Sequence, residues 1–212
     1  MSFNLESALY SIPAVIAGLT IHEAAHATTA YALGDGTAKD QGRISLNPLK
    51  HLDPFGLLFI IFAGFGWAKP VEFNKQLLKH PRRDEALIAA AGPISNLVLG
   101  LFTTLLLKFV ANVLPHSATG MYPVIVNLLL FTIFINFGLF IFNMIPIPPL
   151  DGSHVLLSWL NVAPETEARL YRFGMPLLFG ILILENITRI DILPIGKLVR
   201  FMAKTVFLAL GM

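Results

Sequence analysis

Long apolar runs separated by short polar stretches dominate this chain of 212 residues. Four runs are long enough, or nearly so, to cross a hydrocarbon core of roughly 30 Å at about 20 residues each: 8–33, 84–110, 123–145 and 170–187. The pattern predicts an all-α, multi-pass membrane protein, a helical bundle of about four to six membrane segments.

A shorter apolar run, "PFGLLFIIFAGFGWA" at 54–68, ends among Gly64, Gly66 and Pro70. At about 15 residues it is short for a crossing, and its glycines favour a re-entrant loop. If it does not cross, the end of the 8–33 helix and the end of the 123–145 helix lie at the same membrane face.

Two further segments have mixed polarity. The 34–83 region is the main polar part, and its glycines and the alternation of residues 43–46 predict a small β-hairpin over 36–46. At the C-terminus, Lys197, Arg200 and Lys204 recur at helical spacing among apolar residues. That pattern indicates either an interfacial amphipathic helix or a last, short crossing.

Composition supports a membrane protein. The chain is 55% hydrophobic and 13% charged, with a mean hydropathy of +0.71, whereas soluble domains are about 25% charged. The net charge of +2 gives no argument for a nucleic-acid partner. Because there is no cysteine, disulfides and thiolate metal sites are excluded.

The distribution of cations predicts the orientation. The 111–122 connection has no Lys or Arg, whereas the 34–83 region has Lys39, Arg43, Lys50, Lys69, Lys75, Lys79, Arg82 and Arg83. We expect the protein in the cytoplasmic membrane. By the positive-inside rule the 34–83 region then lies on the cytoplasmic face, and a site on that face opens towards the cytoplasm.

The first apolar helix contains the motif "HEAAH". His22 and His26 are four residues apart, so both imidazoles face the same way and can reach one metal ion. Glu23 is near enough to hold a water molecule beside that metal and take its proton, as in zinc hydrolases. A solvated helix face with incidental histidines is the alternative. It is disfavoured because ionisable groups at membrane depth cost roughly 2.5–3.5 kcal/mol each.

A catalytic zinc requires a third protein ligand. The candidates are His51, Glu72, His80, Asp84, Glu85, His116, Asp151, His154, Glu165, Glu167, Glu185 and Asp191. Asp151 has a distinctive setting in "NMIPIPPLDGSH" (143–154), where three prolines must break the preceding helix. Broken backbone at membrane depth is tolerated where it lines a wet cavity. Asp151 could instead cap the helix that follows, and the two roles can coexist.

Together, these motifs resemble the site-2 protease family of intramembrane zinc metalloproteases. "HEAAH", "GPISN" at 92–96 and "NMIPIPPLDG" carry the resemblance. "LGDGTAKDQGRISLNPLKHLDPFG" followed by "GFGWAKPVEFN" resembles the compact bacterial branch without PDZ or CBS domains. The resemblance implies one Zn²⁺ per chain on His22, His26 and Asp151, with Glu23 as the base. It also implies that Asn143 helps to hold the substrate or the oxyanion.

The expected activity is hydrolysis of peptide bonds within or near transmembrane segments of other membrane proteins. The hairpin at 36–46 or the loop at 64–74 could offer an edge strand to an unwound substrate. The alternative is a non-catalytic metal-binding membrane protein, a transporter or a pseudoprotease scaffold. The expected partners are transmembrane protein or peptide substrates and the lipid bilayer; a homo-oligomer is compatible with the sequence.

We expect a single membrane-embedded metalloprotease domain over 1–212. Its parts are the zinc helix 8–33, the polar hairpin and re-entrant region 34–83, the spans 84–110 and 123–145, the Asp-ligand loop 143–154 and C-terminal helices in 155–212.

Several polar residues have two interpretations each. Asn96 either bonds near the site or links helices structurally, and Gly92 is expected to permit close helix packing. His154 is either a partner of Asp151 or, as we favour, a packing residue at a helix N-terminus. Asn143 could simply satisfy backbone freed by the prolines. His51, in a polar loop, is expected to contact solvent.

Overall fold

The computed structural model describes residues 5–56, 59, 67–114, 120–160, 162–188 and 190–212. Its elements in chain order are α1 (Leu5–Ala32), α2 (Thr37–Asp40), the 3₁₀ helices η1 (Pro48–Lys50) and η2 (Lys75–Leu77), α4 (Pro81–Val113), α5 (Met121–Asn143), α6 (Asp151–Leu160), α7 (Pro164–Thr188) and α8 (Ile195–Ala209).

Four of these helices are long and apolar enough to cross a membrane: α1 from Ser7, α4, α5 and α7. They confirm the multi-pass helical protein that the hydrophobic pattern predicts, and each contains most of one predicted span. The predicted re-entrant loop at 54–68 falls largely outside the described residues.

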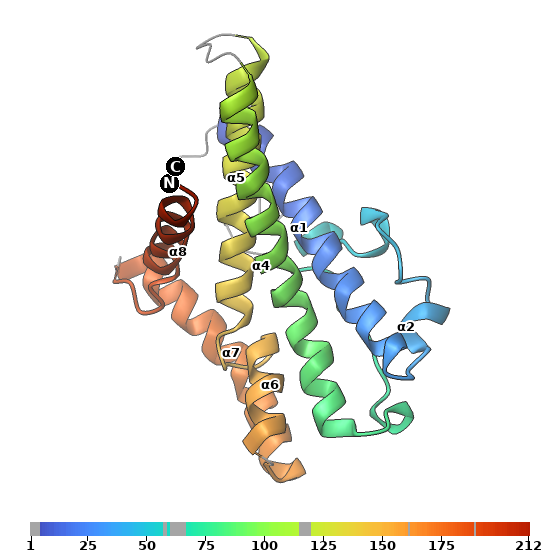
Figure 1. Cartoon of the computed structure of the whole chain (residues 1–212). Coiled ribbons are helices and arrows are strands. Elements are labelled where there is room, and N and C mark those ends of the chain that lie inside the picture. The colour runs from blue at the N-terminus through green and yellow to red at the C-terminus, as the bar shows by residue number, and fades with distance from the viewer. Residues whose placement is uncertain (1–4, 57–58, 60–66, 115–119, 161, 189) are drawn as a thin grey trace.

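Helix α4 is the centre of the bundle and packs against α1, α5 and α6, with a smaller contact to α8 (Figure 1). Because α4 and α5 follow one another through a short connection, they run antiparallel. The end of α5 and the start of α6 therefore lie near the start of α4, at the lower end of the view in Figure 1. Two parts of the chain more than a hundred residues apart, the second half of α1 and the start of α6, thereby become neighbours.

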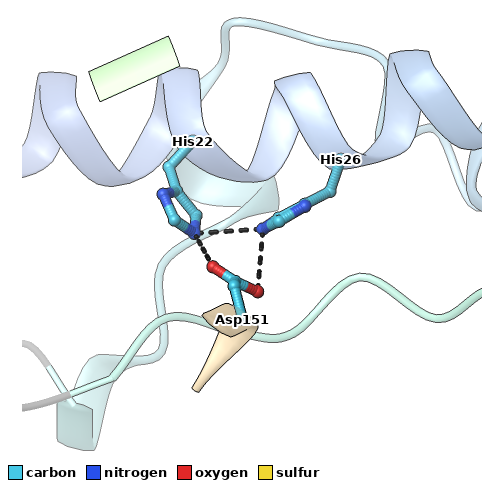
Figure 2. A group of neighbouring side chains, drawn as sticks. All are labelled: His22, His26 and Asp151. Carbon is cyan, nitrogen blue, oxygen red and sulfur yellow. Dashed lines mark hydrogen bonds and ion pairs between the residues drawn. The ribbon is translucent and has the colours of Figure 1, made fainter. Parts of the chain in front are cut away.

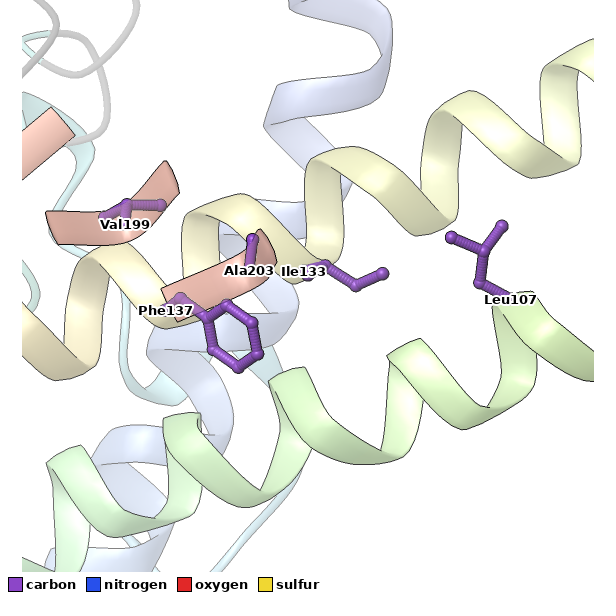
Figure 3. Close-up of a cluster of buried hydrophobic side chains, with 5 residues drawn as sticks. All are labelled: Leu107, Ile133, Phe137, Val199 and Ala203. Atoms are coloured by element: carbon purple, nitrogen blue, oxygen red, sulfur yellow. The ribbon is translucent and has the colours of Figure 1, made fainter. Parts of the chain in front are cut away.

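Away from that end, α4, α5 and α8 share an apolar cluster (Figure 3). It consists of Leu107, Ile133, Phe137, Val199 and Ala203. Between helices in lipid, such contacts stabilise through van der Waals packing, since lipid is as apolar as the side chains. Helix α8 is strongly amphipathic in sequence; its basic residues are exposed while Val199 and Ala203 face the cluster.

The prediction of a β-hairpin over 36–46 is wrong, because the polar region forms no strands there. Residues 37–40 form the single-turn helix α2, and the described β pairing is an isolated bridge between Leu52 and Ala68. The side chain of Asp35 accepts hydrogen bonds from the backbone N–H and hydroxyl of Thr37, at 2.9 and 2.6 Å. Such local bonds favour a helical turn over a strand.

The loop that follows is also more buried than its polar sequence indicates. His51 was expected in solvent, but it is completely buried, and its ring Nε2 lies 2.7 Å from the carbonyl oxygen of Ser45. That expectation was wrong because the loop between α2 and η1 folds over the ring.

Candidate metal centre

Two imidazoles of α1 and one carboxylate of α6 converge on a single point (Figure 2). The Nε2 atoms of His22 and His26 lie 3.0 Å apart. Asp151 faces both, with Oδ2 at 3.1 Å from His22 Nε2 and Oδ1 at 3.5 Å from His26 Nε2. His22 and His26 are buried and Asp151 is partly buried. The three residues that the sequence nominated are thus brought together.

The break after α5 places the carboxylate. Helix α5 ends at Asn143, and the proline-containing turns lead directly into α6, whose first residue is Asp151. Gly152 allows α6 to fold back closely: a Cβ there would lie 2.9 Å from the carbonyl oxygen of Ile145. The carbonyl of Leu150 accepts from the Ser153 backbone N–H at 3.0 Å. Asp151 therefore occupies the first turn of α6 rather than capping it.

Hydrogen bonds on the far side of each imidazole fix its tautomer. Asn96 donates its amide N–H groups to the Gly18 carbonyl (3.0 Å) and to Asn136 Oδ1 (2.9 Å), so its own Oδ1 faces His22 Nδ1 at 2.6 Å. The carbonyl of Ile88 lies 2.7 Å from His26 Nδ1. Because these oxygens only accept, Nδ1 must carry the proton in both rings. In its neutral form, the form that binds a metal, each ring therefore presents an Nε2 lone pair on the side of Asp151.

This arrangement fits a metal ion. Two Nε2 lone pairs and a carboxylate are all acceptors and repel one another unless a cation or proton lies between them. Within the described part of the chain, the buried Asp151 Oδ2 accepts no hydrogen bond. Ligands held by one tetrahedral zinc at about 2.0–2.1 Å lie roughly 3.3 Å apart, close to the three separations found here. The donor set of two imidazoles and a carboxylate is one that zinc uses in hydrolases.

Gly92 of α4 makes room for the centre. A Cβ added there would lie 2.6 Å from His22 Nε2 and closer still to His26 Nε2. The sequence-based expectation for Gly92, close packing between helices, is therefore confirmed, with the imidazole edges as the neighbours. Any side chain at this position would compete with the ligands for the same space.

For the two residues proposed for catalysis, Glu23 and Asn143, the structure gives the position and burial but no contact that tests their roles. Glu23 is 7% exposed and follows His22 directly on α1. Asn143 ends α5, half-buried, and donates its side-chain amide to the Leu139 carbonyl at 3.0 Å, within its own helix. The catalytic roles of both stay predictions.

Other acidic and basic candidates form a separate network beside the centre. Glu85 Oε1 accepts from Lys75 Nζ at 2.8 Å and pairs with His154 Nδ1 at 2.9 Å, and Lys75 also reaches Glu167 at 3.3 Å. Burial alone would lower the pKa of Lys75, but the hydrogen bonds and negative charges of Glu85 and Glu167 together outweigh it and raise the pKa. His154 thus ties α6 to α4 through Glu85, which supports the packing interpretation.

Asn136 is the site residue that sequence reasoning missed. Fully buried in α5, it accepts from Asn96 and donates to the Thr132 carbonyl at 2.8 Å. An amide in an otherwise apolar membrane helix is itself a signal of an internal polar contact, and it could have identified Asn136.

Comparison with known proteins agrees with this geometry. A family model described as peptidase family M50 matches residues 10–184. The chain belongs to that family. The M50 peptidase is 44% identical over 173 residues to YwhC of Bacillus subtilis, a candidate zinc metalloprotease by name, covering 77% of this chain and 76% of the relative. No solved structure matches it.

Two mycobacterial relatives, both called Rip2 and both candidate zinc metalloproteases by name, are more distant. The protein from Mycolicibacterium smegmatis is 34% identical over 74% of this chain, and that from Mycobacterium tuberculosis is 29% identical over the same share. The chain spans 60% of the length of each. Family membership and these relatives identify the chain as a membrane-spanning zinc metalloprotease.

Proposed function

We propose that this M50 peptidase cleaves peptide bonds within or beside the transmembrane segments of other membrane proteins, with one zinc per chain held by His22, His26 and Asp151. The observation that carries the proposal is the convergence of two imidazole lone pairs and a carboxylate, all within 4.8 Å of one another, on one side of a membrane-spanning helix. Ionisable groups are costly at membrane depth, and a cluster of them there therefore indicates a function.

Zinc, when bound, polarises a carbonyl and makes a water molecule more acidic. The remaining chemistry belongs to the chain. A carboxylate oxygen of Glu23 accepts a proton from the attacking water, and Glu23 then delivers that proton to the leaving amine nitrogen. Asn143 donates from its amide to the oxygen of the tetrahedral intermediate. Asn96 and the Ile88 carbonyl keep His22 and His26 in the tautomer and orientation that ligation requires.

A substrate helix hides its carbonyls in backbone hydrogen bonds and has to unwind before cleavage. With no hairpin at 36–46, the described segment 67–74 is the place where an unwound substrate adds as a strand. Its residues lie outside regular helix, and Ala68 already forms an antiparallel bridge with Leu52, which supports an extended backbone there. Strand addition gives affinity through main-chain hydrogen bonds with little demand on sequence.

We further infer that the protein lies in the cytoplasmic membrane as one domain over 1–212, with the 34–83 face in the cytoplasm. The excess of Lys and Arg in that region supports the orientation. The metal centre, at the end of the bundle nearest that region, then opens towards the cytoplasm.

The test compares native protein with Glu23→Gln in proteoliposomes that contain a single-span substrate. The glutamine keeps size and hydrogen bonding but removes the base. We expect equal zinc content and a cleavage rate lower by about 10²–10⁴-fold, the usual contribution of general acid–base catalysis. Glu165→Gln, an exposed acidic residue in the first turn of α7, is the matched control and should cleave normally. Near-native cleavage by Glu23→Gln would refute the mechanism.

A further inference from the structure

A buried arginine, Arg43, fixes one end of the segment 69–74, which directly precedes η2. Arg43 is 3% exposed, and its guanidinium donates to the backbone carbonyls of Lys50, Lys69 and Pro70, the last at 2.8 Å. A buried charge is costly unless its donors are satisfied. The planar guanidinium satisfies this condition by joining three carbonyls from two separate stretches of chain.

A buried aspartate fixes the other end. Asp35 is fully buried; Oδ1 accepts from the backbone N–H and hydroxyl of Thr37, while Oδ2 accepts from the backbone N–H of Asn74 at 2.6 Å. Burial alone would raise the pKa of Asp35, but the hydrogen bonds from Thr37 and Asn74 outweigh it and lower the pKa. The carboxylate is therefore ionised and accepts on both sides.

The backbone between these two anchors is available for pairing. Residues 68 and 69 pair with 51 and 52, through the bridge to Leu52 and the hydrogen bond from Lys69 N–H to the His51 carbonyl at 2.7 Å. After Pro70 this pairing stops. Among the described residues, none accepts a hydrogen bond from the N–H groups at 71–73. An unpaired edge of this kind is a template for a further strand.

The side chains of the segment relate it to the metal centre. Glu72 is exposed, whereas Val71 and Phe73 are half-buried, the alternation expected of a strand with one face on the protein. Phe73 packs against a buried cluster that includes Ile88, and the carbonyl of Ile88 is the partner of His26. The same cluster includes Ala30 of α1, so the segment lies against the helix that carries His22 and His26 and against α4, whose Ile88 carbonyl orients His26.

We propose that Arg43 and Asp35 are positioning residues that hold 69–74 as a preformed edge for the unwound backbone of the substrate. This inference rests on the proposed function. Neither residue contacts the metal ligands; both act through the backbone of the segment, on how well the substrate is held. A preformed edge matters because a strand that must first be ordered binds more weakly.

Asp35→Asn is the sharpest perturbation because it changes hydrogen bonding with almost no change in volume. One oxygen becomes an NH₂ group. Whichever way the amide turns, either Asn74 N–H or Thr37 N–H faces a donor and loses its acceptor. Arg43→Lys perturbs the other end, since one ammonium cannot reproduce the fork that reaches three carbonyls.

The experiment measures kcat and KM for a single-span substrate in proteoliposomes, together with zinc content, in these two variants. We expect KM to rise by about 3- to 10-fold in each, the range for losing one or two hydrogen bonds, with kcat and zinc unchanged. Asp40→Asn and Arg82→Gln, both exposed, are the matched controls and should keep the native KM. A purely structural role would instead lower zinc content and kcat.

A cross-linking measurement keeps the test decisive if Arg43→Lys fails to fold. The chain has no cysteine, so Glu72→Cys places a unique thiol at the middle of the segment. In the Glu23→Gln background, its disulfide yield with a single-cysteine substrate should fall when Asp35→Asn is added. Unchanged yield and unchanged KM in Asp35→Asn would overturn the inference. If native protein cleaves and Glu23→Gln does not, the proposed function stands even then.

Discussion

Gly92→Ala is expected to remove zinc by adding a single methyl group. An added Cβ would lie 2.6 Å from His22 Nε2, whereas ordinary van der Waals contact begins at 3.4 Å, so the imidazole must retreat by at least 0.8 Å. His26 Nε2 would be closer still to the new atom and must retreat further. Zinc sites tolerate about 0.2 Å in a ligand distance of 2.0–2.1 Å. Both histidines would therefore leave bonding range.

The magnitude follows from what smaller disturbances do. Loss of a hydrogen bond behind a ligand usually weakens metal binding by about 10- to 100-fold. Displacing two ligands should exceed that, so we expect zinc affinity to fall by more than 100-fold, about 2.8 kcal/mol. A loss of zinc in Gly92→Ala would not come from a weaker helix, because alanine is favoured over glycine in a helix by about 1 kcal/mol.

The assay is zinc content per chain after dialysis, followed by competition with a chelator. Gly180→Ala is the control: Gly180 is also in a membrane-spanning helix, and a Cβ there meets nothing within 4 Å. It should keep full zinc and native cleavage. If Gly92→Ala also kept one zinc per chain with native resistance to the chelator, the position assigned to the metal beside Gly92 would be wrong.

Three further outcomes follow from the same geometry. Substitution of His22, His26 or Asp151 by alanine should each abolish stoichiometric zinc, measured by elemental analysis; full occupancy after Asp151→Ala would remove that carboxylate from the ligand set. Asn96→Ala should weaken zinc by about 10- to 100-fold in chelator competition because His22 loses its orienting partner, and native affinity would contradict that role. Val71→Pro should leave zinc unchanged but sharply reduce cleavage of an intact membrane-spanning substrate, more than of a short extended peptide, since proline removes a backbone donor. Equal loss for both substrates would indicate a misfolded segment instead.

The metal ligands were predictable because their signals are local. His22 and His26 share a helix face by spacing alone, and the prolines before Asp151 dictate a break wherever the rest of the chain goes. Counting the membrane spans then predicts that the two histidines and Asp151 lie at a similar depth in the membrane. The structure brings these three residues together as that reasoning required.

The orienting contacts could not be settled in the same way. Whether Asn96 reaches His22 depends on how α4 is rotated against α1, which no pattern within α4 specifies. The structure shows the bond to His22 and, at the same time, links to α1 backbone and to Asn136 of α5. Both interpretations left open for Asn96 therefore hold together.

The failed hairpin has a specific cause. Alternation from Arg43 to Leu46 has the period of a strand, but that interpretation assumes that Arg43 points to solvent. Its guanidinium instead finds carbonyls 7, 26 and 27 residues further along the chain. Periodicity cannot predict contacts at such separations, and here they tie Arg43 to the backbone at Lys50, Lys69 and Pro70.

X-ray absorption spectroscopy at the zinc edge, on purified protein of known metal content, tests the central claim most directly. We expect one zinc per chain, bound by two imidazoles and additional oxygen ligands at about 2.0–2.2 Å, with no sulfur. The imidazole signal should persist in Glu23→Gln and disappear in the double variant of His22 and His26. A zinc site without imidazole, or one unchanged in that double variant, would contradict the account.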